Sequence, residues 1–94
     1  MDEREIREKL KDCGIRLLRA GLVQGTWGNL SMRLDGQYMI VTPSGIDYRR
    51  LRPEDMVVVD LDGNRVEGEM NPSSDTATHV ELDKAFSNIG GIVH

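Results

Sequence analysis

The sequence predicts an α/β fold for one small domain. An amphipathic helical pattern covers residues 2–20, short strand-like runs separated by turn signals cover residues 30–69, and a second helical pattern follows Pro72. A last apolar run comes after the glycine pair at residues 90–91. With 94 residues, the chain is long enough for one domain at most.

Composition and charge exclude several classes of protein. Hydrophobic residues make up 38% and charged residues 30%, which is typical of a globular chain and not of a disordered one. The net charge is −4 without a long basic run, so we expect no nucleic-acid partner. No apolar stretch approaches the roughly 20 residues of a membrane span, so we expect no membrane partner. The single cysteine, Cys13, excludes an internal disulfide and predicts a cytoplasmic location.

The first helix is predicted over residues 2–20. Acidic residues occupy its first turn, where they complement the positive end of the helix dipole. One face carries the apolar residues, which are Ile6, Leu10, Cys13, Leu17 and Leu18. Cys13 is therefore expected to pack as a small core residue, and Gly21 is expected to end the helix.

The loop at residues 21–29 contains three glycines within eight residues. Glycines permit positive φ angles and let the backbone approach a ligand closely. Gly28 and Asn29 stand just before a strand and offer N–H groups and an amide to a phosphate, although a plain loop explains them equally well.

Two hairpins are predicted in the middle of the chain. Residues 30–34 alternate apolar and polar, Asp35 and Gly36 indicate a type I′ turn, and residues 37–42 form the returning strand. Pro43 then ends the pairing, and Ser44 with Gly45 makes a second possible anion-binding loop. A short helical turn at 52–55 precedes strands at 56–61 and 65–69.

The second helix is predicted to begin after Pro72. Ser73, Ser74 and Asp75 match an N-cap signal, and a helix N-terminus with two hydroxyls is also able to bind an anion. From Ser74 onward, the spacing predicts one apolar face formed by Thr78, Leu82, Ala85 and Phe86. His79 lies beside that face, and we interpret it as a structural residue rather than a ligand.

The last predicted strand, residues 92–94, stops after three residues, in the middle of an element. Most domains complete their last element before they end. We therefore expect residues 1–94 to be the N-terminal portion of a single longer domain.

Five motifs, taken together, carry a resemblance to a known family. They are GTWGNLS at 25–31, TPSGIDY at 42–48, DMVVV at 55–59, PSSDT at 72–76 and GGIVH at 90–94. In this order and spacing the chain resembles the N-terminal part of the class II aldolase/adducin family. Trp27 and the pair Asp75-Thr76 are most similar to L-ribulose-5-phosphate 4-epimerases, because the L-fuculose-phosphate aldolases of the family typically have Glu at the position of Asp75.

The resemblance implies a three-layer α/β/α fold with a mixed central sheet, incomplete at its C-terminal end. It also implies a homo-oligomer, usually a tetramer, when the protein is full length.

The resemblance further implies a site. The residues expected to bind the sugar phosphate are Gly28, Asn29, Ser44, Gly45, Ser73 and Ser74. His94 is expected to be the first histidine of a His-x-His pair that binds Zn²⁺, with the second histidine just beyond residue 94. Asp75 is expected to be the catalytic acid/base, or a carboxylate bound to the zinc or placed beside it.

The implied function is zinc-dependent epimerisation of a phosphorylated ketose by retro-aldol and aldol steps. The alternatives are a class II aldolase or dehydratase of a sugar phosphate, and a non-catalytic module of the adducin kind. We expect the 94-residue chain itself to be inactive, because His94 is one of the three or four ligands that zinc requires.

Overall fold

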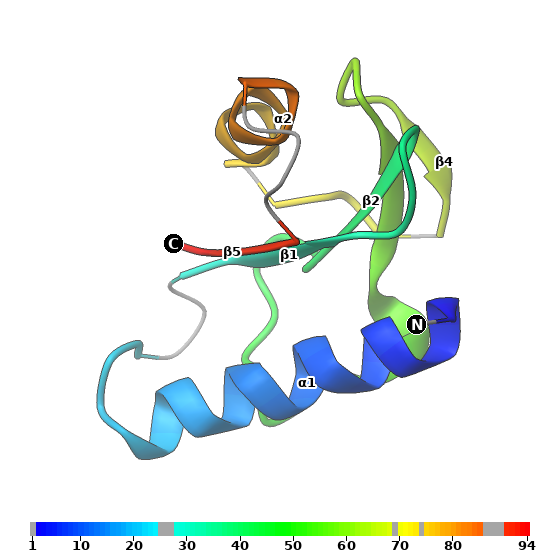
Figure 1. Cartoon of the computed structure of the whole chain (residues 1–94). Helices are drawn as coiled ribbons and strands as arrows, with labels where there is room; N and C mark the ends of the chain where they lie inside the picture. Colours follow the sequence, from blue (N-terminus) through cyan, green and yellow to red (C-terminus); the bar gives the residue numbers. More distant parts are fainter. Residues whose placement is uncertain (1, 25–27, 69, 74, 86–89) are drawn as a thin grey trace.

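The computed structural model describes residues 2–24, 28–68, 70–73, 75–85 and 90–94, so Trp27, Ser74 and Phe86 lie outside the described residues. The chain forms an α/β structure, as predicted, with the element order shown in Figure 1. The elements are α1 (Glu3–Arg19), β1 (Leu30–Arg33), β2 (Tyr38–Val41), the 3-10 helix η1 (Pro53–Asp55), β3 (Val57–Asp60), β4 (Arg65–Glu67), α2 (Thr76–Ala85) and β5 (Gly91–Val93).

The described strands form one five-stranded sheet in the order β4-β3-β2-β1-β5. Every pairing among them is antiparallel, whereas the resemblance implied a mixed sheet. The difference has a topological reason. Strands β1 to β4 each pair antiparallel with the next strand in the chain, and β5 returns after α2 to pair antiparallel with β1.

The two helices lie on opposite faces of this sheet (Figure 1). Ile6 and Leu10 of α1 belong to a core cluster with Leu30, Ile40 and Val58. The alternate strand residues point to the other face and form a second cluster with one residue of α2; its buried members are Met39, Val41, Val57, Val59 and Val80. The three-layer arrangement of a whole domain stays a prediction.

Helix α1 begins and ends as the sequence predicted. The Asp2 carboxylate accepts a hydrogen bond from the Glu5 N–H at 2.8 Å and so caps the first turn. Gly21 has a φ of +72°, and the Leu22 N–H reaches back to the Leu17 carbonyl at 3.0 Å. Cys13 is half-buried against the first core cluster, which confirms that it packs.

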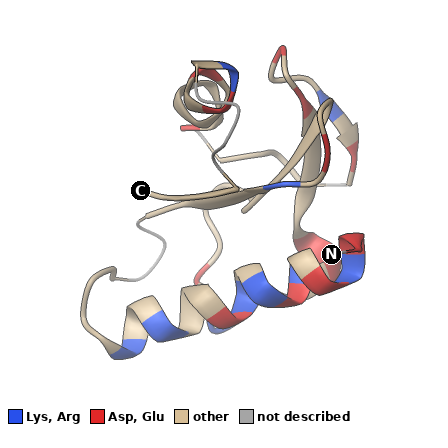
Figure 2. Ribbon diagram, viewed as in Figure 1, with Lys and Arg blue, Asp and Glu red and all other residues tan. Residues whose placement is uncertain are grey.

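Charges of both signs are interspersed along α1 (Figure 2). Two pairs are spaced one turn apart: Arg4 lies 3.1 Å from Glu8, and Arg7 lies 3.4 Å from Glu3. The second pair differs from the first because the Arg7 side chain is buried.

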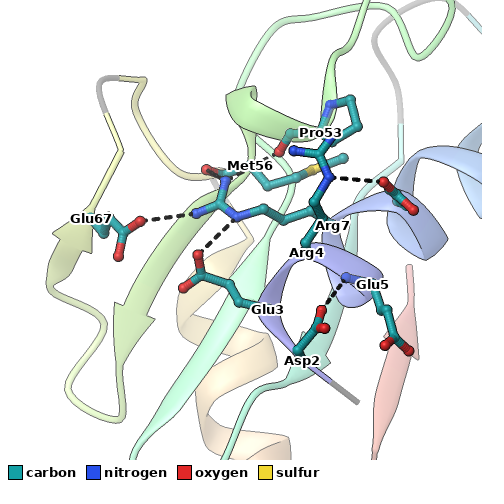
Figure 3. Close-up of polar contacts among 9 residues, drawn as sticks. Asp2, Glu3, Arg4, Glu5, Arg7, Pro53, Met56 and Glu67 are labelled. Carbon is teal, nitrogen blue, oxygen red and sulfur yellow. Dashed lines mark hydrogen bonds and ion pairs between the residues drawn. The ribbon is translucent and has the colours of Figure 1, made fainter.

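Arg7 joins α1 to the sheet, a role that the sequence did not reveal (Figure 3). Its Nη1 donates to the carbonyls of Pro53 and Met56 at 3.1 and 3.0 Å, and its Nη2 lies 3.5 Å from Glu67 of β4. A buried guanidinium needs such partners, because an unpaired one is costly to remove from water. Arg7 therefore ties the start of α1 to η1 and β4.

The predicted type I′ turn at Asp35-Gly36 is wrong. Neither residue has a positive φ, although a type I′ turn requires positive φ at both central positions. Instead, the Asp35 carboxylate accepts hydrogen bonds from the N–H groups of Gln37 and Tyr38 at 2.7 and 3.0 Å. The connection is thus an open loop held by an aspartate side chain, a common alternative use of this residue.

The predicted apolar face of the second helix is also wrong. Thr78 and Ala85 are exposed, Leu82 is half-buried, and Phe86 lies outside the described residues. The buried face consists instead of Thr76, His79, Val80 and Asp83. Hydrophobic periodicity misses this face because most of its residues are polar and are buried through hydrogen bonds and ion pairs.

Asp83 shows how a polar residue is held on that face. Its Oδ1 lies 3.4 Å from the Arg33 guanidinium of β1, and Arg33 also donates to the Asp83 carbonyl at 2.9 Å. Burial raises the pKa of Asp83, and the charge of Arg33 opposes that rise. Helix α2 therefore docks on β1 partly through this ion pair.

Candidate functional site

An open cavity of about 480 Å³ lies where the loop after α1, the start of α2 and the end of the chain meet. Its lining residues are Gly21, Leu22, Val23, Gln24, Gly28, Asn29, Asp75 and His94. Four of the residues predicted for the site, Gly28, Asn29, Asp75 and His94, are therefore brought together from three separate segments of the chain.

Backbone pairing places His94 at this cavity. The Asn29 N–H donates to the His94 carbonyl at 2.8 Å, and the His94 N–H donates to the Asn29 carbonyl at 2.9 Å. These two bonds continue the β1–β5 ladder beyond the ends of the strands. His94 is thus held beside Asn29, the residue that precedes β1.

Gly28 allows the loop to come this close. Its φ is +85°, and a Cβ at this position would lie 2.7 Å from Val23 Cγ1 and 3.3 Å from the His94 carbonyl oxygen. Any other residue would be strained by the backbone conformation and would also collide with a neighbour.

Asp75 stands between Asn29 and His94. The Asn29 side-chain amide donates to Asp75 Oδ2 at 2.6 Å, and His94 Nδ1 lies 3.3 Å from the same oxygen. The side chains of Asp75 and His94 are 41% and 57% exposed, so both remain accessible from the cavity. A carboxylate and an imidazole in this arrangement are able to exchange protons with a bound molecule or to ligate a metal ion.

Behind Asn29 lies a buried histidine, His79. Its Nδ1 is 2.6 Å from the Ser31 hydroxyl, and its Nε2 is in hydrogen-bond contact with Asn29 Oδ1. Burial lowers the pKa of His79, as does the neighbouring His94, while Asp75 opposes the shift. The sequence-based interpretation of His79 as structural fits its burial. Its contact with Asn29 was missed, because residues 29 and 79 meet only through the docking of α2 on β1.

Ser44, Gly45 and Ser73 do not line the cavity. The segments around Pro43 and Pro72 pair as an isolated antiparallel bridge, with the Ser44 N–H bonded to the Asn71 carbonyl and the Ser73 N–H to the Thr42 carbonyl. This bridge holds the segment of Ser44 beside the segment of Ser73. Ser73 is nearly buried, and its hydroxyl accepts from the Asp75 N–H at 3.3 Å, as a residue that caps a helix start does.

His94 and Asp75 are both common zinc ligands, and they lie side by side at the cavity. Among the described residues there is no group of three or more His, Cys, Asp or Glu side chains able to hold a metal ion. The described chain therefore supplies two donors that fit part of a zinc site.

None of the helices in the described part of the chain combines the length and the apolar character that a bilayer crossing requires.

Comparison with known proteins gives a consistent result. The model of the family described as the class II aldolase and adducin N-terminal domain matches residues 8–94. An L-fuculose 1-phosphate aldolase of solved structure is 38% identical, with a TM-score of 0.90 over 96% of this chain and 43% of that one.

Two further solved structures are similar. YgbL from Klebsiella pneumoniae, for which aldolase, epimerase or decarboxylase activity has been suggested, is 30% identical with a TM-score of 0.93 and covers 100% of this chain and 45% of its own. The L-fuculose-1-phosphate aldolase from Thermus thermophilus is 33% identical with a TM-score of 0.76, over 90% of this chain and 43% of its own.

The chain thus spans less than half the length of each of these three proteins. The family match nevertheless extends over most of the chain and includes the candidate site residues Gly28, Asn29, Asp75 and His94. The chain belongs to the class II aldolase and adducin family.

Proposed function

We propose that the protein to which this chain contributes an N-terminal part performs zinc-dependent retro-aldol chemistry on a phosphorylated ketose. One observation carries the proposal. The Asp75 carboxylate and the His94 imidazole lie 3.3 Å apart at an open cavity, and Asn29 holds the same carboxylate oxygen. The similarity to L-fuculose 1-phosphate aldolases supports this chemistry.

In the proposed mechanism Asp75 moves the proton. Cleavage of a carbon–carbon bond next to a hydroxyl requires a base to remove the hydroxyl proton and an acid to return it. Two observations support this role: Asn29 donates to one of the Asp75 oxygens, and the Asp75 side chain remains accessible from the cavity. The hydrogen bond from Asn29 keeps the Asp75 carboxylate in one orientation while the proton moves.

His94 would hold the zinc ion together with residues beyond those described, with the Asp75 carboxylate beside the ion. When bound, zinc supplies Lewis-acid stabilisation of the negative charge that develops on the substrate oxygens. A neutral imidazole suits this ligand role.

The phosphate would be bound away from the reacting carbons, so that binding energy orients the substrate. The proposed binding residues are Gly28, Asn29, Ser44, Gly45, Ser73 and Ser74. Serine hydroxyls suit a phosphate, because they donate hydrogen bonds without competing for zinc. The backbone N–H groups of Asn29, Ser44 and Ser73 are already bonded to backbone carbonyls, so these residues would bind through their side chains. The antiparallel bridge between the segments of Ser44 and Ser73 supports a shared role for these two segments.

The whole protein is proposed to complete a three-layer α/β/α domain with a mixed sheet, to act as a tetramer and to reside in the cytoplasm. In this proposal residues 1–94 are the N-terminal portion of that domain, and the further zinc ligands come from the remainder.

Two forms of the reaction are favoured by different observations. Asp75, where L-fuculose-phosphate aldolases typically have Glu, favours an epimerase that rejoins the two fragments with inverted stereochemistry. The 38% identity to an L-fuculose 1-phosphate aldolase favours an enzyme that releases the aldehyde.

Product analysis separates the two forms. The full-length, zinc-loaded protein would be incubated with L-ribulose 5-phosphate and, separately, with L-fuculose 1-phosphate, and the products followed by NMR. An epimerase yields the C4 epimer of the first substrate without release of glycolaldehyde phosphate. An aldolase cleaves the second substrate into a ketone phosphate and a free aldehyde. If the folded, zinc-loaded protein converts neither substrate nor related ketose phosphates, the catalytic proposal is wrong and an adducin-like module takes its place.

A further inference from the structure

The hydrogen bonds behind Asp75 form a directed chain from the sheet to the cavity. The chain runs from Ser31 of β1 through His79 of α2 to Asn29 and then to Asp75. Ser31, His79 and Asn29 are all buried, whereas the side chain of Asp75 is 41% exposed at the open cavity. Water therefore cannot easily replace any of the inner partners.

The direction of each bond follows from the chemistry of the groups. An ionised carboxylate only accepts, so Asn29 must turn its NH₂ group to Asp75. Its carbonyl oxygen then faces His79 and also only accepts, so His79 must carry its proton on Nε2. Nδ1 is left as an acceptor for the Ser31 hydroxyl. The contacts are therefore satisfied by a single combination, in which His79 carries its proton on Nε2 and Asn29 turns its NH₂ group to Asp75.

The opposite tautomer would break the chain at two places. With the proton on Nδ1, the Nε2 lone pair would face the Asn29 carbonyl oxygen. Rotation of the amide by 180° would relieve that contact, but it would place the carbonyl oxygen against the Asp75 carboxylate. Two acceptors at a hydrogen-bond distance repel, so Asp75 would turn away.

We propose that His79 is a positioning residue, which holds Asn29 in the one orientation that donates to Asp75 and thereby orients that carboxylate toward the cavity. The role in catalysis rests on the proposed function, whereas the positioning of Asn29 stands on the contacts alone. The lowered pKa of His79 agrees with the neutral ring that the hydrogen bonds require.

Two amide substitutions of His79 provide a matched test. In His79→Gln the amide nitrogen falls near the position of Nε2, so the bond to Asn29 is kept. In His79→Asn the amide nitrogen falls near Nδ1, so a contact with Ser31 remains and the bond to Asn29 is lost. Both variants bury one amide, so a purely structural role predicts equal effects.

The experiment uses the full-length, zinc-loaded protein. We expect His79→Gln to retain kcat within about 10-fold of the wild type, and His79→Asn to lose a further 10- to 100-fold or so, the usual effect of removing an outer hydrogen-bond partner. The loss should fall on kcat rather than KM, at matched melting temperatures. Crystal structures should show the Asn29 amide turned away from Asp75 in His79→Asn alone.

A measurement on the wild type remains decisive even if neither variant folds. ¹⁵N-histidine NMR should show the proton of His79 on Nε2, and a proton on Nδ1 would overturn the positioning proposal. Equal kcat in two folded variants would overturn it as well and leave the proposed function intact. A wild type that is inactive but shows the Nε2–H tautomer would instead remove the proposed function and leave the positioning of Asn29 in place.

Discussion

One carboxylate oxygen, Asp75 Oδ2, has two different neighbours: the amide of Asn29 at 2.6 Å and the imidazole of His94 at 3.3 Å. The hydrogen bond from the Asn29 side-chain amide holds the carboxylate in place. The His94 imidazole is a second group beside it that is able to carry a proton or bind a metal ion. The proposed chemistry at the scale of the residue depends on this shared contact.

The first prediction concerns the charge of Asp75. Asp75→Asn removes the basic oxygen and places a second amide against Asn29, so turnover of the ketose phosphate by the full-length protein should fall by about 100-fold or more. Asp12→Asn, which changes an exposed carboxylate on α1, should leave the rate unchanged. Steady-state kinetics at saturating zinc would measure both. An Asp75→Asn variant with wild-type kcat would exclude Asp75 as the acid/base.

The second prediction concerns Gly28. Gly28→Ala forces a side chain into a left-handed conformation and into contact with Val23, so it should lower the free energy of unfolding by about 1–2 kcal/mol. Gly36→Ala is the matched control, because Gly36 has no positive φ and its Cβ would meet open space. Urea unfolding of the two variants measures the difference. Equal stabilities would show that the loop accommodates a Cβ at position 28.

At the scale of the element, the helices dock by two different means. Helix α1 packs an apolar face on one side of the sheet and adds the buried guanidinium of Arg7, whereas α2 docks largely through the polar residues His79 and Asp83. Periodicity predicted the first face correctly, because apolar spacing marks it. It failed for the second, since polar residues are buried there only when partners on β1 satisfy them.

The third prediction concerns Arg7. Arg7→Met leaves the carbonyls of Pro53 and Met56 without their guanidinium partner in a buried place, so it should lower the free energy of unfolding by about 2–4 kcal/mol. Arg4→Met, on the exposed side of the same helix, should change it by less than about 0.5 kcal/mol. Chemical denaturation provides the measurement. A similar small effect at both positions would mean that packing alone holds α1.

The fourth prediction concerns pH. The pKa of His79 is lowered in the folded protein, so the unfolded state binds more protons between the folded pKa and the ordinary value of 6.5. The stability that a neutral His79 contributes is therefore complete above pH 6.5 and decreases as the pH falls below it. The stability difference between wild type and His79→Gln should decrease over the same range. A difference that stays constant from about pH 7.5 to about pH 5 would show that His79 does not titrate differently on unfolding.

At the scale of the whole molecule, the sequence predicted an α/β chain, the order of its elements and the family. It also named Gly28, Asn29, Asp75 and His94, which the structure brings to one cavity. Short motifs made this possible, because each marks a loop or a helix start that has a special local conformation. Their roles in binding and catalysis remain proposals.

Other features depend on contacts between distant segments. The wholly antiparallel pairing of the described strands, the partners of Arg7 and the chain of hydrogen bonds from Ser31 through His79 to Asn29 arise only after the helices dock on the sheet. No local pattern in a single sequence indicates which buried polar residues will form hydrogen bonds with each other. The separation of Ser44 and Gly45 from the cavity was hidden for the same reason.

We propose that Asp75 and His94 belong to a zinc-dependent site for a phosphorylated ketose. The most direct test is turnover of the ketose phosphate by the full-length protein before and after removal of zinc by a chelator. The account predicts that chelation abolishes turnover and that added Zn²⁺ restores it. Turnover that persists in the metal-free protein, or no turnover in the folded zinc-loaded protein, would contradict it.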